Sequence, residues 1–227
     1  MDPIYLELQT NAFLKLTEIE NSQELMDEFN ALALELTPYT VEVNGKQYTP
    51  LDLDVASLID TNEDPLFGGI GYGILGDYSK SQIVETTLAK QVPKTMNLIY
   101  KLFGKAWIRR VKISKLPPNS NMLLHSHPYL YQPNCNNEVV IHIPLQTNPG
   151  VLAVVSKNDQ ATDAKKHHFD VGGVWYLNTF YHHKFENNGS EDRYHLWINL
   201  VWNDAVCGIN QDFSNLVQKQ LSQGIKL

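Results

Sequence analysis

From residue 107 onward, the chain is a succession of short, mainly apolar stretches separated by turn-forming residues. Residues 107–116 (WIRRVKISKL) alternate between apolar and polar side chains, as a strand with one buried face does. Proline, glycine and asparagine gather between the stretches, for example at residues 117–121 and 187–192. Short strands that recur at intervals of roughly 8–12 residues predict a β-sandwich, barrel or jelly roll. The predicted strands cover residues 107–116, 121–127, 138–146, 151–156, 165–171, 174–180, 183–188 and 193–203.

The first hundred residues have a different pattern. Residues 22–36 begin with a capping serine, carry early acidic residues and place apolar residues at helical spacing, and residues 54–59 and 95–103 are weaker helix candidates. Residues 67–80 are rich in glycine but lack the Lys-Ser/Thr of a phosphate-binding loop, so they are interpreted as a loop. A further helix is predicted near the C-terminus, at residues 211–222.

These patterns predict a mainly β protein with some α-helix, in three parts. Residues 1–106 are expected to form a mainly helical segment packed on the core, residues 107–206 the β core, and residues 207–227 a C-terminal helix. A core of about 100 residues is the usual size of a β-sandwich domain.

Composition excludes some classes of function. The net charge of −7 and the absence of a basic stretch argue against a nucleic-acid partner. Cys135 and Cys207 have neither metal-binding nor redox spacing, which favours a reducing compartment. Residues 1–11 do not have the pattern of a signal peptide, and no apolar run approaches membrane-spanning length. We therefore expect a cytoplasmic protein without a membrane partner; its oligomeric state has no signal in the sequence.

The histidines are unevenly distributed, because all eight lie between His125 and His195. His125 and His127 are alternate residues of a predicted strand and so share one face. His182 and His183 follow much later in the chain. A non-heme iron site commonly takes two histidines and one carboxylate from separate strands. The spacing fits such a site, with either His182 or His183 as the distal histidine, but the carboxylate is missing.

Two further residues, Arg193 and His142, are candidates to line the same site as these histidines. If residues 184–187 form a hairpin with the strand that begins at Arg193, that arginine faces the distal histidine, and a buried arginine needs an anion such as a carboxylate. A surface salt bridge to Glu186, Glu191 or Asp192 is the alternative. His142, in VVIHIPL, lines the same pocket or is a core histidine bonded to the backbone. Residues 128–138 form either a lid or an ordinary surface loop.

Four stretches carry a resemblance to a known family: VKISKLPPNSNMLLHSHP, IHIPLQTNPG, GGVWYLNTFYHHKFENNGSEDR and HLWINLVW. In their order along residues 111–204 they resemble the aspartyl/asparaginyl β-hydroxylase family of 2-oxoglutarate-dependent oxygenases. The resemblance implies a double-stranded β-helix, the cupin-like jelly roll, here with a helical N-terminal segment. It also implies iron(II) bound by His125 and by His183, with His182 as the alternative, and Arg193 binding the distal carboxylate of 2-oxoglutarate. His142 and Ser114 would lie near the same cosubstrate.

The chain departs from the family pattern at two positions. His127 stands where many members have an aspartate ligand. It is taken here as the third metal ligand, and the alternative is that it turns away and water fills the position. Val140 stands where an arginine often contacts the substrate carboxylate. The resemblance thus implies a dioxygenase that uses Fe(II) and 2-oxoglutarate to hydroxylate an unactivated C–H bond of an amino acid, a peptide side chain or a small natural product. The alternatives are a cupin-type three-histidine dioxygenase that does not use 2-oxoglutarate, and a non-catalytic metal- or ligand-binding module.

Overall fold

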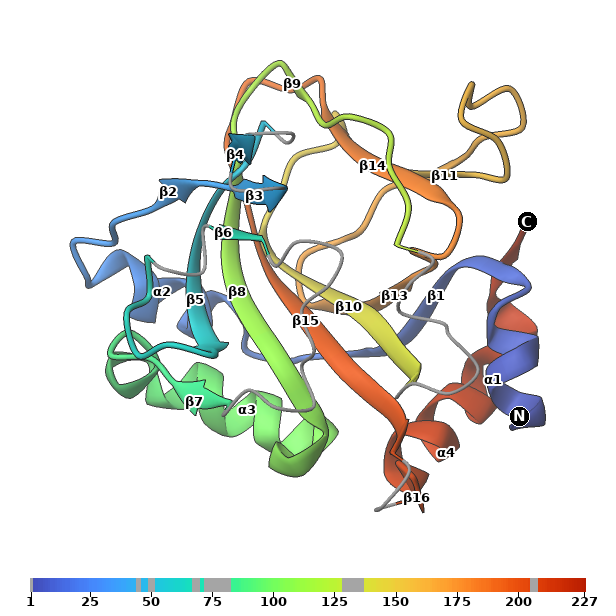
Figure 1. Ribbon diagram of the computed structural model, residues 1–227, viewed down its shortest axis with the longest axis horizontal. Helices are drawn as coiled ribbons and strands as arrows, with labels where there is room; N and C mark the ends of the chain where they lie inside the picture. The colour runs from blue at the N-terminus through green and yellow to red at the C-terminus, as the bar shows by residue number, and fades with distance from the viewer. Residues whose placement is uncertain are drawn as a thin grey trace.

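Two antiparallel sheets form most of the computed structural model, which describes residues 2–43, 46–48, 52–66, 70–71, 83–127, 137–204 and 208–227 (Figure 1). The main sheet has the order β17 (Ile225–Lys226), β1 (Asn11–Glu18), β13 (Gly173–Leu177), β10 (Asn137–Gln146), β15 (Arg193–Asp204), β8 (Ile108–Leu116), β5 (Asp54–Asp60) and β2 (Thr37–Pro38). At its periphery β16 (Gly208–Ile209) pairs with β15, and β7 (Val84–Glu85) pairs with β5. The second sheet has the order β12 (Lys165–His167), β11 (Val151–Ser156), β14 (His182–Asn187) and β9 (Ser120–Asn121). A small third sheet contains β4 (Lys46–Tyr48), β3 (Thr40–Val43) and β6 (Ile70–Gly71).

Side-chain alternation along the central strands separates two cores. On β8, Val111 and Ile113 belong to a core that the main sheet shares with the helices, while Leu116 belongs to a core between the two sheets. On β15, Leu196 and Ile198 face the helices and Trp197 faces the second sheet. Both faces of the central strands are therefore buried, and the polar residues among them lie inside the protein.

Four helices contribute to the core on the helical side of the main sheet: α1 (Pro3–Leu8), α2 (Ser22–Asn30), α3 (Pro93–Phe103) and α4 (Gln211–Gln220). α3 begins with a proline at its first position and is followed by Gly104, whose φ of 74° suits a residue without Cβ. The Glu28 carboxylate of α2 accepts hydrogen bonds from the backbone N–H groups of Lys94 and Thr95, both at 2.8 Å, and so caps α3. Among the described residues, no helix combines the length and apolar character needed to cross a membrane.

The structure corrects the expectation that residues 1–106 are mainly helical. β1 pairs with β13, and β5 pairs with β8, so this segment adds strands on both sides of the central strands. Residues 54–59, expected to be helical, belong to β5, where nearly every residue is buried. A short apolar run that is buried on both faces has no period-two pattern, and periodicity alone cannot distinguish it from a helix.

Other expected elements agree more closely with the structure. The helix expected at 95–103 is confirmed as α3, and the one expected at 211–222 is confirmed as α4. The helix expected at 22–36 is confirmed at its start but ends at Asn30, after which the chain leads into β2. The strand expected at 165–171 is shorter and ends at His167. Most of the glycine-rich segment 67–80 lies outside the described residues.

Candidate metal and cosubstrate site

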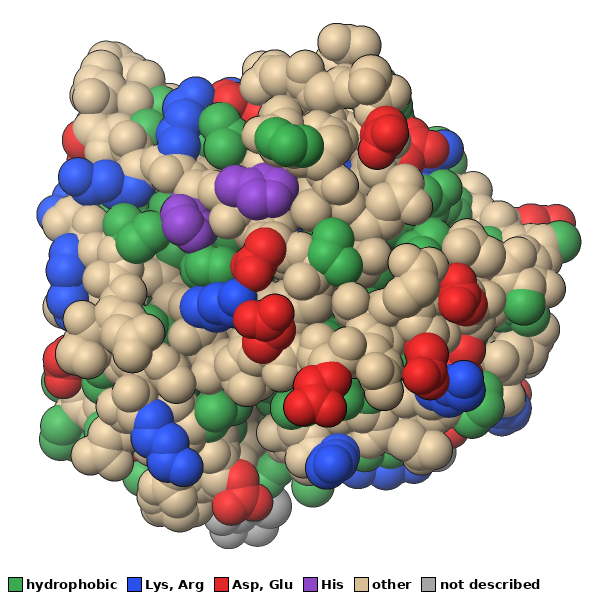
Figure 2. Space-filling view, turned by 180° about the vertical axis from the view of Figure 1, so that it is seen from behind, with side chains coloured by type: hydrophobic (Ala, Val, Ile, Leu, Met, Phe, Trp, Pro, Cys, Tyr) green, Lys and Arg blue, Asp and Glu red, His purple; other side chains and the backbone are tan. Residues whose placement is uncertain are grey.

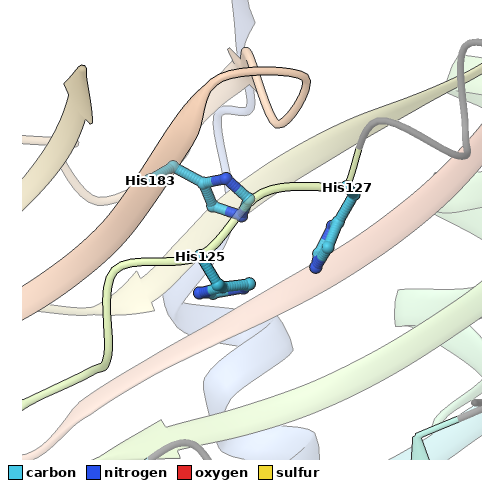
Figure 3. A group of neighbouring side chains, drawn as sticks. All are labelled: His125, His127 and His183. Carbon is cyan, nitrogen blue, oxygen red and sulfur yellow. The ribbon is translucent and has the colours of Figure 1, made fainter. Parts of the chain in front are cut away.

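Three histidines converge from two chain segments at the edge of the second sheet (Figure 3). His125 and His127 follow β9, and His183 lies on β14. The backbone of His125 pairs with that of His183 through two hydrogen bonds, of 3.2 and 2.7 Å. The His127 N–H donates to the Thr179 carbonyl at 2.8 Å. These backbone hydrogen bonds hold His125 and His127 close to His183. One ring nitrogen of each of the three histidines lies within 4.8 Å of the others.

Backbone carbonyls determine which nitrogen of two of these rings is available. Nδ1 of His125 lies 2.8 Å from the Leu123 carbonyl, and Nδ1 of His183 lies 3.0 Å from the Tyr181 carbonyl. A carbonyl only accepts, so Nδ1 must carry the proton in both rings. Nε2 then has the free lone pair, which is the usual arrangement of a metal-binding histidine.

Burial favours the neutral form of all three rings. Desolvation lowers the pKa of His125, and it lowers that of His183 well below the ordinary value of 6.5, with the neighbouring imidazoles adding to the effect in His183. Desolvation, then His125, then the positive charge of Arg110 lower the pKa of His127 to about 3. Neutral imidazoles are the form that binds a metal, so protons compete only weakly with a metal for the three rings at pH 7.

The donor set fits one transition-metal ion. With metal–nitrogen bonds of about 2.1 Å, the donors of one ion lie roughly 3–4 Å apart. The ring nitrogens of the three histidines, which lie within 4.8 Å of one another, are close to that spacing. His182 takes no part in this group, because successive residues of β14 point to opposite faces and His183, not His182, points inward. Of the two distal histidines that the sequence left open, the structure brings His183 to His125 and His127.

A pocket of about 360 Å³, counting the open space at its mouth, lies beside the three histidines, between the sheets. Its wall is mainly apolar, and His142 and His195 are the other histidines in it. The lining residues are Leu53, Met122, His125, His127, Val140, His142, Leu177, Thr179, His183, Phe185, His195 and Trp197. Small-molecule sites commonly have this combination of apolar wall and few polar groups.

Arg193 lies at one end of this region and has no anionic partner among the described residues. Its side chain is fully buried, and its guanidinium carbon lies 4.1 Å from the centre of the Phe185 ring. Nη1 donates to Nδ1 of His195 at 2.7 Å, whereas Nε and Nη2 have no hydrogen-bond acceptor. Burial lowers the pKa of Arg193 to about 9, so the group keeps its charge at pH 7. The surface salt bridge considered as an alternative is not formed with any described acidic side chain.

Two more buried polar groups without partners lie on the same face of the main sheet. Ser114 is fully buried and stands beside His195 in the β8–β15 register, and its hydroxyl makes no hydrogen bond. His142 is nearly buried, and neither ring nitrogen is hydrogen-bonded. Desolvation and then the charge of Arg193 lower its pKa well below 6.5. A buried polar group without a partner is destabilising unless a ligand or water satisfies it. The three groups fit an anionic ligand with a carboxylate at Arg193.

The residues predicted for the metal and the cosubstrate thus lie together, and several other residues line the pocket without having been predicted for the site. His195 is the polar one on β15, and it follows Arg193 at an interval of two. The period of two along a strand was the signal that could have identified it. Val140 lines the pocket as an apolar residue. The segment 128–138, interpreted as a lid or a loop, lies almost entirely outside the described residues.

The face of the molecule in Figure 2 carries both acidic and basic side chains, with hydrophobic ones scattered among them. Some histidine side chains reach this surface, while His183 and His142 are buried.

Comparison with known proteins gives a family and a fold. A family model described as Aspartyl/Asparaginyl beta-hydroxylase matches residues 74–203, whereas no curated protein matches. HygX from Streptomyces hygroscopicus, solved with nickel and 2-oxoglutarate bound, is 12% identical with a TM-score of 0.52, over 88% of this chain and 87% of that one. An oxidoreductase of the 2OG-Fe(II) oxygenase family from Burkholderia pseudomallei is 17% identical with a TM-score of 0.48, over 82% and 80%. A prolyl-4-hydroxylase from Pseudomonas putida is 12% identical with a TM-score of 0.49, over 87% and 96%. The expected cupin-like jelly roll is confirmed.

Proposed function

The chain belongs to the aspartyl/asparaginyl β-hydroxylase family and is a hydroxylase, and on that premise we propose that it uses iron(II) and 2-oxoglutarate as a dioxygenase. Its substrate on this proposal is an amino acid, a peptide side chain or a small natural product, in which an unactivated C–H bond is hydroxylated. We also propose a cytoplasmic location, which the lack of metal or redox spacing between Cys135 and Cys207 supports; both cysteines lie outside the described residues.

One observation carries the proposal: Arg193 is a buried cation with two unpartnered nitrogens, next to a pocket beside three converging histidines. A three-histidine site on its own is compatible with several kinds of metal enzyme. An unpaired buried arginine is specific to an anionic ligand, because the guanidinium presents its donors in a planar fork that matches a carboxylate. A cosubstrate with a carboxylate at its distal end satisfies this requirement.

Each residue has a role on this proposal. His125, His183 and His127 would hold the metal, and Arg193 with the Ser114 hydroxyl would bind the distal carboxylate. When bound, iron(II) and 2-oxoglutarate supply the oxidative decarboxylation with oxygen that drives C–H hydroxylation. His195 accepts a hydrogen bond from Arg193 and thereby fixes the direction of its free donors. The side chains of Phe185 and Trp197 form part of the apolar wall of the pocket and exclude water from it.

The test is spectroscopic and is made without oxygen. We expect the purified protein with iron(II) and 2-oxoglutarate to show the weak visible charge-transfer band of the chelated cosubstrate. Arg193→Ala should weaken the band at a fixed cosubstrate concentration because the distal carboxylate loses its charged partner, and Arg109→Ala, on the same sheet but outside the pocket, should not. His127→Ala then tests whether His127 is the third ligand: if it is, the variant should bind less iron per protein molecule than the native protein.

The alternatives give different results. Bound iron without any band would contradict 2-oxoglutarate use and would favour the three-histidine dioxygenase, an alternative that His127 in place of a carboxylate makes chemically reasonable. A band with no consumption of 2-oxoglutarate under oxygen would instead indicate a non-catalytic binding module.

A further inference from the structure

Lys112 is a fully buried lysine near the pocket whose amine has no hydrogen-bond partner, and burial lowers its pKa well below the ordinary value of 10.5. The side chain is fully buried, and no acceptor among the described residues lies within hydrogen-bond distance of Nζ. Its one ion pair in the described part of the chain is with the Asp60 carboxylate, at 3.9 Å, which is too long for a hydrogen bond. An ammonium group has three donors, and burying it unpaired is strongly unfavourable.

Asp60 is already shared among several other groups. Its carboxylate accepts hydrogen bonds from the Ser57 hydroxyl and the Thr61 backbone N–H, each at 2.9 Å. One of its oxygens also lies 3.6 Å from Nε of the buried Arg110. Arg110 and Lys112 therefore share this carboxylate.

Glu138, the other buried acidic group near Arg110, forms no ion pair with Lys112. Its carboxylate accepts a hydrogen bond from Asn199 at 3.3 Å. Within the described residues, the distant and shared Asp60 is thus the counter-charge of Lys112, and a further anion would satisfy the free donors of its amine.

Lys112 lies beside a residue of the pocket wall. In the β8–β15 register it is the partner of Trp197, a pocket-lining residue whose indole N–H is also buried without an acceptor. The Tyr39 ring lies over the amine, with its centre 5.3 Å from Nζ, and is tilted against the Trp197 ring at 5.6 Å. Two residues with unsatisfied buried donors are therefore cross-strand neighbours at this wall.

This wall is at a distance from the arginine assigned to the cosubstrate. Arg193 pairs with Leu116, four residues along β8 from Lys112, which corresponds to roughly 14 Å between their positions. The two side chains also diverge, because Arg193 contacts Phe185 and His195 whereas Lys112 is directed toward Asp60 at the other end of the sheet. One small dicarboxylate that is bound at Arg193 leaves Lys112 unsatisfied.

We propose that Lys112 and the indole N–H of Trp197 bind a carboxylate of the molecule that is hydroxylated. The substrate is then a carboxylic acid, held with its anionic end at this wall and its reacting carbon toward the three histidines. This inference rests on the proposed function, because it names the substrate class of the same site.

The experiment measures binding in the absence of turnover. The protein is loaded with nickel(II) and 2-oxoglutarate, and the probes are N-acetyl derivatives of the common amino acids together with the matching C-terminal amides. We expect at least one acid to raise the melting temperature and its amide to leave it unchanged. Lys112→Met, which conserves volume, and Lys112→Gln, which keeps a neutral donor, should each weaken binding of that acid about 10- to 100-fold by calorimetric titration. Lys101→Met, an exposed lysine on α3, serves as the control.

The two proposals fail in different ways. If 2-oxoglutarate does not raise the melting temperature of the metal-loaded protein, the proposed function fails first. If it does, the inference alone is overturned by any of three results: no acid binds, an acid and its amide bind equally, or the Lys112 variants bind the acid as the native protein does.

Discussion

One face of β15 carries several of the residues that are assigned to the site. Arg193, His195 and Trp197 alternate along β15, and the register places Ser114 and Lys112 beside the last two. The sequence predicted His125 and His142 as site residues because they are polar residues among apolar ones, and Arg193 through the resemblance to the family. It was not sufficient to choose between His182 and His183, since one residue of register decides which of them points inward.

His195 positions Arg193, and its replacement tests that role. His195→Leu removes the acceptor of the 2.7 Å hydrogen bond and leaves a third donor of the guanidinium unsatisfied. We expect the dissociation constant for 2-oxoglutarate to rise about tenfold, since a lost hydrogen bond to a charged group is worth roughly 1.5–3 kcal/mol. His195→Gln, which retains a side-chain acceptor, should recover part of the affinity. An unchanged dissociation constant in His195→Leu, measured by anaerobic titration, would mean that the arginine is oriented by its packing on Phe185 alone.

At the scale of elements, the strand pattern was the most informative part of the sequence. Strands that begin and end at turn residues were located well, as β8, β10 and β15 show. β5 was mistaken for a helix because burial on both faces removes the alternation that identifies a strand. The contribution of β1 to the main sheet could not be foreseen, because pairing with β13 is a long-range contact that local periodicity does not record.

Asn187, at the end of β14, joins several elements near the start of β15. Its fully buried amide donates to the carbonyls of Leu116, Pro117 and Glu191, and its oxygen accepts from Gly189. We expect Asn187→Ala to lower the free energy of unfolding by about 2–4 kcal/mol, because several buried backbone groups lose their partners together.

The binding of 2-oxoglutarate should also weaken in Asn187→Ala, since the turn that Asn187 holds leads directly into Arg193. Chemical denaturation and cosubstrate titration measure the two effects. Asn121→Ala, which removes an exposed acceptor of Lys184, is the control and should change little. A loss of affinity in the control as large as in Asn187→Ala would contradict this account.

The cap that α2 provides for α3 is a second element-scale feature. Glu28 accepts hydrogen bonds from two backbone N–H groups and from the Thr95 hydroxyl. Glu28→Ala should lower the free energy of unfolding by about 1–2 kcal/mol, as the loss of other N-terminal helix caps does. Glu24→Ala, on the same helix, removes only an exposed ion pair with Lys94 and should have little effect in the same denaturation series. Equal effects of the two substitutions would show that the cap adds no stability.

For the whole molecule, the buried imidazoles make stability depend on pH. Burial and Arg193 lower the pKa of His142 and His195 well below 6.5, so both stay neutral in the folded protein while they become protonated in the unfolded chain. The unfolded state therefore binds more protons below about pH 6.5, and the free energy of unfolding falls as the pH falls, by up to about 1.4 kcal/mol per pH unit for each histidine.

Urea denaturation of the metal-free protein between pH 8 and pH 5 measures this slope. His142→Leu should make the decrease shallower by about 1.4 kcal/mol per pH unit near pH 5, because one fewer proton is taken up on unfolding. At pH 7.5 the variant should be no less stable than the native protein, since neither nitrogen of His142 is hydrogen-bonded. A slope that matches the native protein would show that His142 is already protonated in the folded state.

The backbone pairing of His125 with His183 also determines at which stage of folding the metal site forms. The two residues are far apart in the chain, and the hydrogen bonds between them close the edge of the second sheet. Long-range pairings of this kind form late, because the intervening chain must first be ordered. A refolding chain therefore acquires high metal affinity only once this edge has closed, and the time course of metal uptake reports the completion of the sandwich.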